Sequence, residues 1–306
     1  MNMNVESVNV ATSTRVKKFG LLGYPLGHSM SNYIHKRIFE MCELVDCKYA
    51  LYEIKPDELS SMGERLRELH GFNVTIPYKT QIIPYLDRLD ESAAVYGSVN
   101  CVTLHETDAG KPRYIGYNTD GYGFLKALEA LGASLDSRVL LLGCGGTGRM
   151  MAVEAIKAGA ELTLAIRRDP AEEKAAAKLS GELREIAARN TIRQTGAGVR
   201  ITYSDMLNTA NSYNLLLNAT PCGMHPNVDE IPITPGLLDK VEYLFDAIYN
   251  PYPTKLIREA QRRGVRTGDG MTMLVHQAVQ AQRIWNDIQI SSADTEKIIE
   301  GARWQL

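Results

Sequence analysis

Short apolar runs alternate with longer amphipathic segments from residue 18 onward. Residues 18–23, 49–54 and 72–76 have the length and content of strands, while helical spacing of apolar positions fills 32–44 and about 57–69. Alternation of strand and helix favours a layered α/β structure with parallel strands. We therefore predict that the first part of the chain is an α/β domain.

The second part of the chain repeats this alternation. Helices are predicted at 121–131, 149–158, 170–188 and 272–289, and strands at 139–142, 162–166, 215–218 and 243–247. The polar stretch 189–199 is predicted to be a loop or a helix end, and Gly268 to Gly270 a turn. The first domain boundary is placed near Asp120.

A glycine cluster follows the apolar strand 139–142 and opens the next helix. The cluster places four glycines and a threonine in a G-x-G-x-x-G pattern: Gly143, Gly145, Gly146, Thr147 and Gly148. In that context the first glycine permits a tight turn, the second lets the backbone approach a pyrophosphate, and the third allows close packing of helix on strand. The pattern predicts a Rossmann-type dinucleotide-binding domain.

The end of the strand at 162–166 indicates which dinucleotide binds. An NAD site usually places a carboxylate about 20 residues after the glycines, whereas this chain has Arg167 and Arg168 there. Guanidinium groups bind a 2′-phosphate well, so we predict NADP. Asp169 follows directly, and if it turned inward the site would accept NAD as well.

Composition narrows the class of protein. The 306 residues are 44% hydrophobic and 23% charged, and the net charge of -2 gives no electrostatic reason to expect nucleic acid or a membrane surface as a partner. There is no apolar run of about 18 residues and no signal-peptide pattern, and the first sixteen residues are predicted to be a disordered lead-in. Scattered cysteines indicate reduced thiols in a cytoplasmic protein, and the histidine spacing predicts no metal site.

Several polar residues of the first domain stand out, although each has an ordinary structural explanation. Ser29 and Ser31 would be helix caps, Lys79 a solvated residue at a helix start, and 118–121 a capped turn. Asn73 and Thr75 share one face of a predicted strand, and Asn100 precedes another strand.

Taken together, these residues resemble the shikimate dehydrogenase family, and the similarity runs from Phe19 to about Ile284. The matching segments, in chain order, are 27–31, 73–79, 118–121, 143–148, 218–221, 246–251 and 273–277. The resemblance implies two α/β domains with the active site in the cleft between them. It also implies that the first domain is split into 1–119 and 270–306, around an NADP-binding domain at 120–269.

The same resemblance implies roles for individual residues. Lys79 and Asp120 would form the catalytic pair, Ser29 and Ser31 would bind the substrate carboxylate, and Ile248 and Gly270 would lie beside the nicotinamide. The remaining substrate contacts would be Asn73, Thr75, Asn100, Tyr249 and Gln277.

The implied activity is NADP-dependent interconversion of shikimate and 3-dehydroshikimate in a cytoplasmic monomer or homodimer, as part of aromatic amino acid biosynthesis. Lys79 would act as acid and base, or stay charged and polarise the reacting oxygen. One alternative is a quinate/shikimate dehydrogenase that uses both acids and both NAD and NADP. Another is a ligand-sensing relative without catalysis, although that protein would need neither Lys79 nor Asp120.

Three positions depart from the family pattern. Asn32 replaces a proline, Thr272 replaces a glycine near the expected nicotinamide, and Ile166 replaces an asparagine in the expected adenosine pocket. We expect the first change to affect only the helix start and the second to alter cofactor fit or turnover, while the third leaves the details of the adenosine pocket open.

Overall fold

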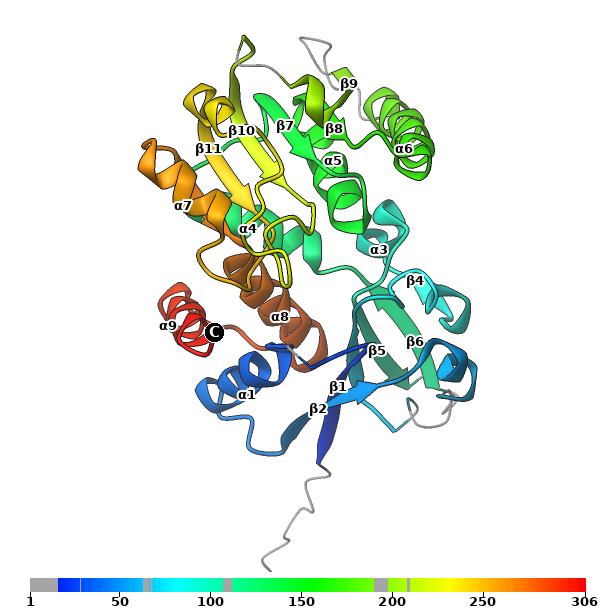
Figure 1. The fold of residues 1–306 in the computed structure, drawn as a ribbon. Helices are drawn as coiled ribbons and strands as arrows, with labels where there is room; N and C mark the ends of the chain where they lie inside the picture. Colours follow the sequence, from blue (N-terminus) through cyan, green and yellow to red (C-terminus); the bar gives the residue numbers. More distant parts are fainter. Residues whose placement is uncertain are drawn as a thin grey trace, which may run out of the picture.

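A computed structural model describes residues 16–27, 29–62, 66, 68–106, 112–189, 198–207 and 210–306. Most of the predicted lead-in, His28 of the 27–31 segment and most of the predicted loop at 189–199 lie outside these residues. The chain forms two lobes, each built on its own six-stranded sheet (Figure 1).

The first sheet has the strand order β2-β1-β3-β5-β6-β4 and is mixed. Its strands are β1 (Lys17–Gly23), β2 (Cys47–Glu53), β3 (Gly71–Val74), β4 (Arg88–Leu89), β5 (Cys101–Glu106) and β6 (Pro112–Tyr117). β1 pairs in parallel with β2 and β3, but β5 is antiparallel to both β3 and β6. The prediction of parallel strands was therefore wrong for β5, whose link to β6 is too short for a crossover.

The second sheet is parallel throughout, with the order β12-β11-β10-β7-β8-β9. Its strands are β7 (Arg138–Leu142), β8 (Glu161–Ile166), β9 (Gly198–Tyr203), β10 (Tyr213–Asn218), β11 (Val241–Asp246) and β12 (Arg266–Asp269). Read from the other end, this is the 3-2-1-4-5-6 order of a Rossmann sheet, whose switch point lies between β7 and β10.

Helices surround both sheets. They are α1 (Ser31–Met41), α3 (Glu91–Tyr96), α4 (Asp120–Leu131), α5 (Gly146–Ala158), α6 (Pro170–Arg189), α7 (Lys255–Arg262), α8 (Gly270–Asn286) and α9 (Ser292–Arg303). Residues predicted as a helix at 57–69 instead begin with the 3₁₀ helix η1 (Pro56–Met62); three more such turns are η2 (Ile83–Tyr85), η3 (Ser204–Met206) and η4 (Pro235–Lys240). No helix in the described part of the chain is long and apolar enough to cross a membrane.

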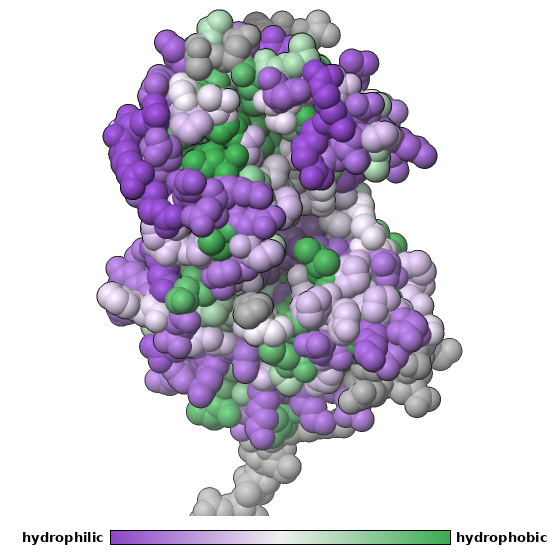
Figure 2. Space-filling view, in the orientation of Figure 1, coloured by the Kyte–Doolittle hydropathy of each residue, from purple (hydrophilic) through white to green (hydrophobic). Residues whose placement is uncertain are grey.

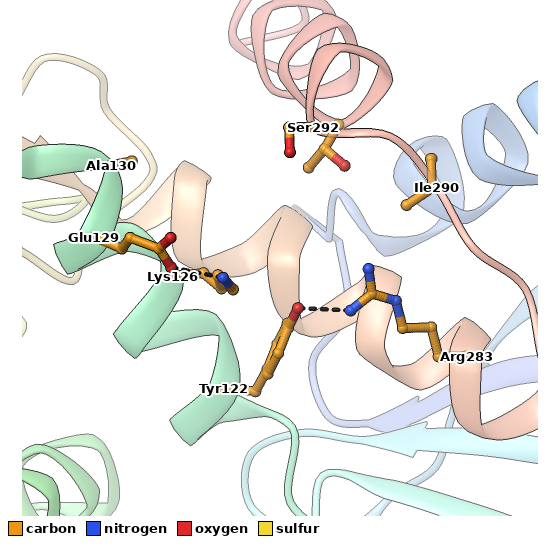
Figure 3. A pocket seen from close by; sticks show the side chains of 8 residues that line it. Tyr122, Lys126, Glu129, Ala130, Arg283, Ile290 and Ser292 are labelled. Atoms are coloured by element: carbon orange, nitrogen blue, oxygen red, sulfur yellow. Dashed lines mark hydrogen bonds and ion pairs between the residues drawn. The ribbon is translucent and has the colours of Figure 1, made fainter.

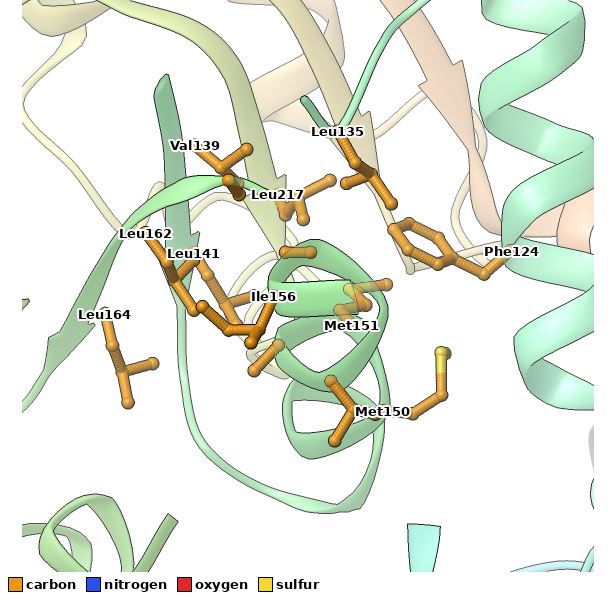
Figure 4. Packing of buried hydrophobic residues seen from close by; sticks show 14 of the residues in the cluster. Phe124, Leu135, Val139, Leu141, Met150, Met151, Ile156, Leu162, Leu164 and Leu217 are labelled. Atoms are coloured by element: carbon orange, nitrogen blue, oxygen red, sulfur yellow. The ribbon is translucent and has the colours of Figure 1, made fainter. Parts of the chain in front are cut away.

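Separate hydrophobic cores stabilise the two lobes. In the second lobe, α5 lies over the sheet, with Met151 and Ile156 in one core with Leu141 and Leu217 (Figure 4). Phe124 of α4 belongs to the same core. α8 runs between the lobes (Figure 1) and packs on α4, α1 and α9. The C-terminal helices thus return to the first lobe, as a split first domain requires; the residue limits of the two domains stay a prediction.

His35 of α1 is completely buried in the first lobe. Its ring stacks on Tyr49 with centroids 4.1 Å apart, its Nδ1 lies 2.8 Å from the Gln282 amide nitrogen, and its Nε2 has no hydrogen-bond partner among the described residues. Burial lowers the pKa of His35 from its usual 6.5 to about 3. The folded state therefore keeps this imidazole neutral.

We expect the free energy of unfolding to fall by about 2 kcal/mol between pH 7.5 and pH 5 because of His35. The folded pKa lies below the unfolded value, so the stabilisation is complete above pH 6.5 and is lost as the pH falls toward 3. His35→Phe keeps a ring stacked on Tyr49 but cannot take up a proton. Urea titrations at both pH values should show a smaller loss of stability for the variant than for the wild type.

The comparison with His35→Phe is necessary because another buried group titrates in the opposite sense. Burial raises the pKa of Asp246 from 3.8 to about 6, so its contribution to stability is lost as the pH rises through 6. Both proteins share that contribution, and it cancels in the difference. If the two proteins lost equal stability between the two pH values, the prediction would be wrong. Either the His35 imidazole would stay neutral in the unfolded chain, or solvent would reach it in the folded one.

Candidate active site

Lys79 and Asp120 form an ion pair at the junction of the two lobes. Lys79 Nζ lies 2.6 Å from Asp120 Oδ2, and the two side chains are 31% and 18% exposed. Lys79 lies in a run of turns rather than at the predicted helix start, and its carbonyl accepts a hydrogen bond from the Val99 backbone. Asp120 is the first residue of α4, where the helix dipole stabilises a negative charge. The pair is half-buried and still open to a ligand.

Asn100 connects this ion pair to α8. Its Nδ2 donates to Asp120 Oδ1 at 2.8 Å and lies 3.3 Å from Gln277 Oε1, while its Oδ1 accepts from the Thr119 backbone at 2.7 Å. Asn100 and Gln277 are 3% and 7% exposed. The orientation of the Asn100 amide is therefore fixed on both sides, and Asp120 is held by two different donors.

Asn73 lies behind Asn100 on β3. Its Nδ2 donates to the Asn100 carbonyl at 3.1 Å, and its Oδ1 accepts from the Tyr49 hydroxyl at 2.7 Å. Burial raises the pKa of Tyr49 well above 10, against the opposing effect of a hydrogen bond with Ser31. The phenol thus stays protonated and links two predicted substrate residues. No signal in the sequence marks Tyr49, because an aromatic residue in a strand is ordinary.

The other predicted substrate residues make contacts of their own. Ser29 Oγ accepts from the Ser31 backbone at 3.3 Å, while the α1 cap is Met30, whose side chain makes no capping bond. Thr75 packs its methyl group against Gly23 just beyond the end of β3, and Tyr249 is half-buried beside α1 and α8. Burial also raises the pKa of Tyr249.

The glycine cluster forms the loop between β7 and α5, as predicted. Gly143 has a φ of 88°, which only glycine adopts readily, and a Cβ on Gly148 would lie 2.3 Å from the Gly143 carbonyl oxygen. Gly145 caps α5, which begins at Gly146, followed by Thr147. Next to Gly143 and Gly145 lies a cavity of about 730 Å³, bounded also by the end of β8 and by residues 219–227. On the face drawn in Figure 2, hydrophobic side chains gather in a hollow of the upper lobe.

The two predicted cofactor arginines have different surroundings. Arg167 lines the cavity and pairs with Glu172, and this hydrogen bond raises the pKa of Arg167. Arg168 is not among the described residues that line the cavity; it donates to Asp205 at 2.8 Å and lies over the Tyr203 ring. Asp169 does not turn inward, because its Oδ1 accepts the backbone N–H groups of Ala171 and Glu172 and caps α6.

Ile248 and Gly270 lie together at the start of α8. The Gly270 N–H donates to the Ile248 carbonyl at 3.3 Å, and a Cβ on Gly270 would lie 2.1 Å from the Ala247 carbonyl oxygen. Only glycine fits at this contact between the backbone that follows β11 and the start of α8. The predicted turn at Gly268 to Gly270 is instead the end of β12 and the first residue of α8.

Two of the departures from the family pattern acquire a structural explanation. Thr272 Oγ1 accepts a hydrogen bond from Arg303 at 3.2 Å, and Arg303 also donates to Asp269 at 2.7 Å. The threonine therefore ties α9 to the start of α8, through an arginine that sequence analysis did not single out. Ile166 is 2% exposed and belongs to the core of the second lobe while also lining the cavity.

A second, smaller cavity of about 330 Å³ lies between α4, α8 and α9 (Figure 3). Lys126 pairs with Glu129 at 2.6 Å, and Arg283 donates to the Tyr122 hydroxyl at 2.6 Å. Its described lining includes none of the predicted site residues. This cavity is separate from the lysine–aspartate pair.

A Rossmann sheet with a glycine loop, joined to a mixed α/β lobe whose polar cluster faces the junction, defines a two-domain dinucleotide-binding protein. Residues 21–102 match the family model described as the shikimate dehydrogenase substrate binding domain. The chain belongs to the shikimate dehydrogenase family.

Curated relatives and solved structures support this membership. The chain is 34% identical to the shikimate dehydrogenase (NADP(+)) of Clostridium perfringens, over 93% of this chain and 98% of that one. The corresponding protein of Methanothermobacter thermautotrophicus is 35% identical, over 87% and 89% of the two chains. A shikimate dehydrogenase solved with NADP+ is 32% identical, with a TM-score of 0.80 over 94% of this chain and 95% of that one. The Thermus thermophilus enzyme solved with NADP(H) and shikimate is 28% identical, with a TM-score of 0.76 over 94% and 99%.

These comparisons confirm the predicted family and the two-domain α/β fold. The structure brings Lys79, Asp120, Asn100 and Gln277 together, with Asn73 directly behind them. Arg168 is not among the described residues that line the larger cavity. The roles of all these residues stay predictions.

Proposed function

We propose that this protein is an NADP-dependent shikimate dehydrogenase, which interconverts shikimate and 3-dehydroshikimate by hydride transfer. The observation that carries the proposal is the 2.6 Å Lys79–Asp120 pair at the lobe junction, in a chain whose second lobe carries a glycine loop of the Rossmann type. A non-catalytic relative would have no use for this half-buried pair. Relatives named shikimate dehydrogenase (NADP(+)) over nearly the whole chain support the same reaction.

The residues around the larger cavity fit a dinucleotide. A Cβ on Gly145 would meet no atom of the protein within 4 Å, so at this position the chain leaves open space beside the start of α5. The N-terminus of α5 is suited to a pyrophosphate, and Arg167 to a phosphate on the adenosine ribose. Ile248 and Gly270 would face the nicotinamide, which accepts or supplies the hydride when NADP is bound.

The first lobe would bind and orient the ring acid. Ser29 and Ser31 would hold the carboxylate, while the buried amides of Asn73, Asn100 and Gln277 would meet ring hydroxyls, with Thr75 and Tyr249 beside them. Because these amides are fixed by neighbours, the reacting carbon would be held in one position, and such positioning lowers the barrier.

Lys79 would donate and accept the proton of the reacting oxygen. Its Nζ, held 2.6 Å from Asp120 Oδ2, would donate a proton to the ketone oxygen as an alcohol forms, and take the proton back in the opposite direction. Asp120 would hold Nζ in place and, through its second oxygen, keep the Asn100 amide turned toward the ring.

A matrix of kcat/KM values for shikimate and quinate, each with NADP and NAD, tests the activity. We expect shikimate to exceed quinate by on the order of tenfold, since the extra hydroxyl of quinate beside its carboxylate must fit between Ser29 and Ser31. Equal values for the two acids would instead favour a quinate/shikimate dehydrogenase. Binding of NADP without turnover of either acid would favour the ligand-sensing alternative.

Oligomeric state and cellular location complete the proposal. We place the protein in the cytoplasm as a monomer or homodimer with a small-molecule substrate. The nearly balanced charge of the chain and its scattered cysteines support this placement.

A further inference from the structure

Arg167 is already occupied by a carboxylate of its own chain. Its backbone N–H donates to Glu172 Oε2 at 2.9 Å, its Nε donates to Glu172 Oε1 at 2.7 Å, and one terminal guanidinium nitrogen also contacts Oε1. The Arg167 side chain is 78% exposed, whereas that of Glu172 is 23% exposed. Both residues line the larger cavity.

The position of Glu172 is fixed by the fold. It lies in the first turn of α6, where the helix dipole stabilises its charge. Its backbone N–H donates to the capping Asp169, and its carbonyl lies 3.7 Å from the sulfur of Cys144 in the glycine loop. Glu172 thus contacts, through its backbone, the loop that would hold the pyrophosphate and, through its carboxylate, the arginine that would hold the ribose phosphate.

NADP and NAD differ at the 2′ position of the adenosine ribose and need different protein groups there. A 2′-phosphate accepts hydrogen bonds from two guanidinium N–H groups, and one of the edges of Arg167 that could supply them, formed by Nε and a terminal nitrogen, is bonded to Glu172. A ribose 2′-hydroxyl needs an acceptor, which a carboxylate supplies. An exposed ion pair contributes little by itself, so the larger effect expected of Glu172 is the repulsion between its carboxylate and a 2′-phosphate that shares the surroundings of Arg167.

We propose that Glu172 sets the cofactor selectivity of this chain: it competes with the 2′-phosphate for Arg167 and offers an acceptor to the 2′-hydroxyl, so that the site takes NAD as well as NADP. This inference rests on the proposed function of the same site. It places the acceptor for the 2′-hydroxyl on α6, five residues beyond the arginine, instead of at Asp169.

Dissociation constants of the full-length protein for NADP and for NAD, measured by titration calorimetry without substrate, test the inference. In Glu172→Gln we expect the ratio of the NAD constant to the NADP constant to rise on the order of tenfold, the scale of one like-charge contact at a partly exposed site. Glu173→Gln is the matched control, because it removes the same charge from the next residue, whose carboxylate accepts from Tyr203 instead. Its ratio should stay within about threefold of the wild type.

A ratio within about threefold of the wild type in Glu172→Gln overturns the inference, and so does a lower ratio, which would mean that Glu172 orients Arg167 for the phosphate. An equal rise in Glu173→Gln overturns it too, since the effect would then belong to the general charge of α6. If the wild type binds neither dinucleotide, the proposed function fails as well, and that result is distinct from an unchanged ratio.

Discussion

Lys79→Met lowers kcat for shikimate oxidation by at least about 100-fold, the usual scale for a positioned proton-transfer group. Methionine keeps an unbranched side chain of similar length but removes the charge and the donor that lies 2.6 Å from Asp120. Nothing would then take the proton from the reacting oxygen or stabilise its charge. NADP affinity should stay unchanged, because Lys79 belongs to the first lobe and the glycine loop to the second.

The chain offers a matched control on α4. Lys126 also forms a 2.6 Å ion pair, with Glu129, but lies at the second cavity. Lys126→Met should change kcat by less than about threefold, the scale of a surface ion pair. If Lys79→Met turns over as fast as this control, Lys79 has no part in the reaction.

Lys79→Arg separates the two roles left open for the lysine. Arginine keeps the charge but does not give up a proton at ordinary pH. A variant as slow as Lys79→Met would assign proton transfer to Lys79. A variant that recovers most of the rate would assign polarisation of the oxygen by a fixed charge.

The second sheet and its loop were predictable because local sequence dictates them. An unbroken apolar strand such as 139–142 is typical of a sheet covered on both faces, and the glycines after it are required by the φ of Gly143 and by the close approach of Gly148. The dependence on local sequence also explains why β9 was not predicted. β9 is an edge strand, its residues are mostly exposed or half-buried, and it lacks the continuous apolar content of its neighbours.

The site was predictable only in part. Lys79 and Asp120 belong to segments shared with the family, and Asn100 was singled out as a polar residue before a strand, but the contacts that fix all three come from long-range pairing. Tyr49, Glu172 and Arg303 look like an ordinary strand residue and two ordinary surface charges. Their importance depends on what the fold places opposite them, namely Asn73, Arg167 and Asp269. No local pattern encodes such a partner.

Gly148→Ala should lower the free energy of unfolding by about 1–3 kcal/mol, the cost of forcing a methyl group into a packed site. The added Cβ would lie 2.3 Å from the Gly143 carbonyl oxygen, which is backbone and cannot rotate away. Gly143 is itself tied to β8 by a hydrogen bond from its N–H to the Ala165 carbonyl at 3.0 Å. The loop must therefore move, and we expect its affinity for NADP to fall by at least about 30-fold.

Gly146→Ala provides the comparison, because an added Cβ there meets no protein atom within 4 Å at the same end of α5. Its free energy of unfolding should stay equal or rise by up to about 1 kcal/mol, since alanine favours helix more than glycine. Urea titration of both variants, with NADP calorimetry on Gly148→Ala, decides the point. If Gly148→Ala matched Gly146→Ala in stability and kept wild-type affinity, the loop backbone would have to yield freely. Gly148 would then match the G-x-G-x-x-G pattern without being required for the packing of α5 on β7.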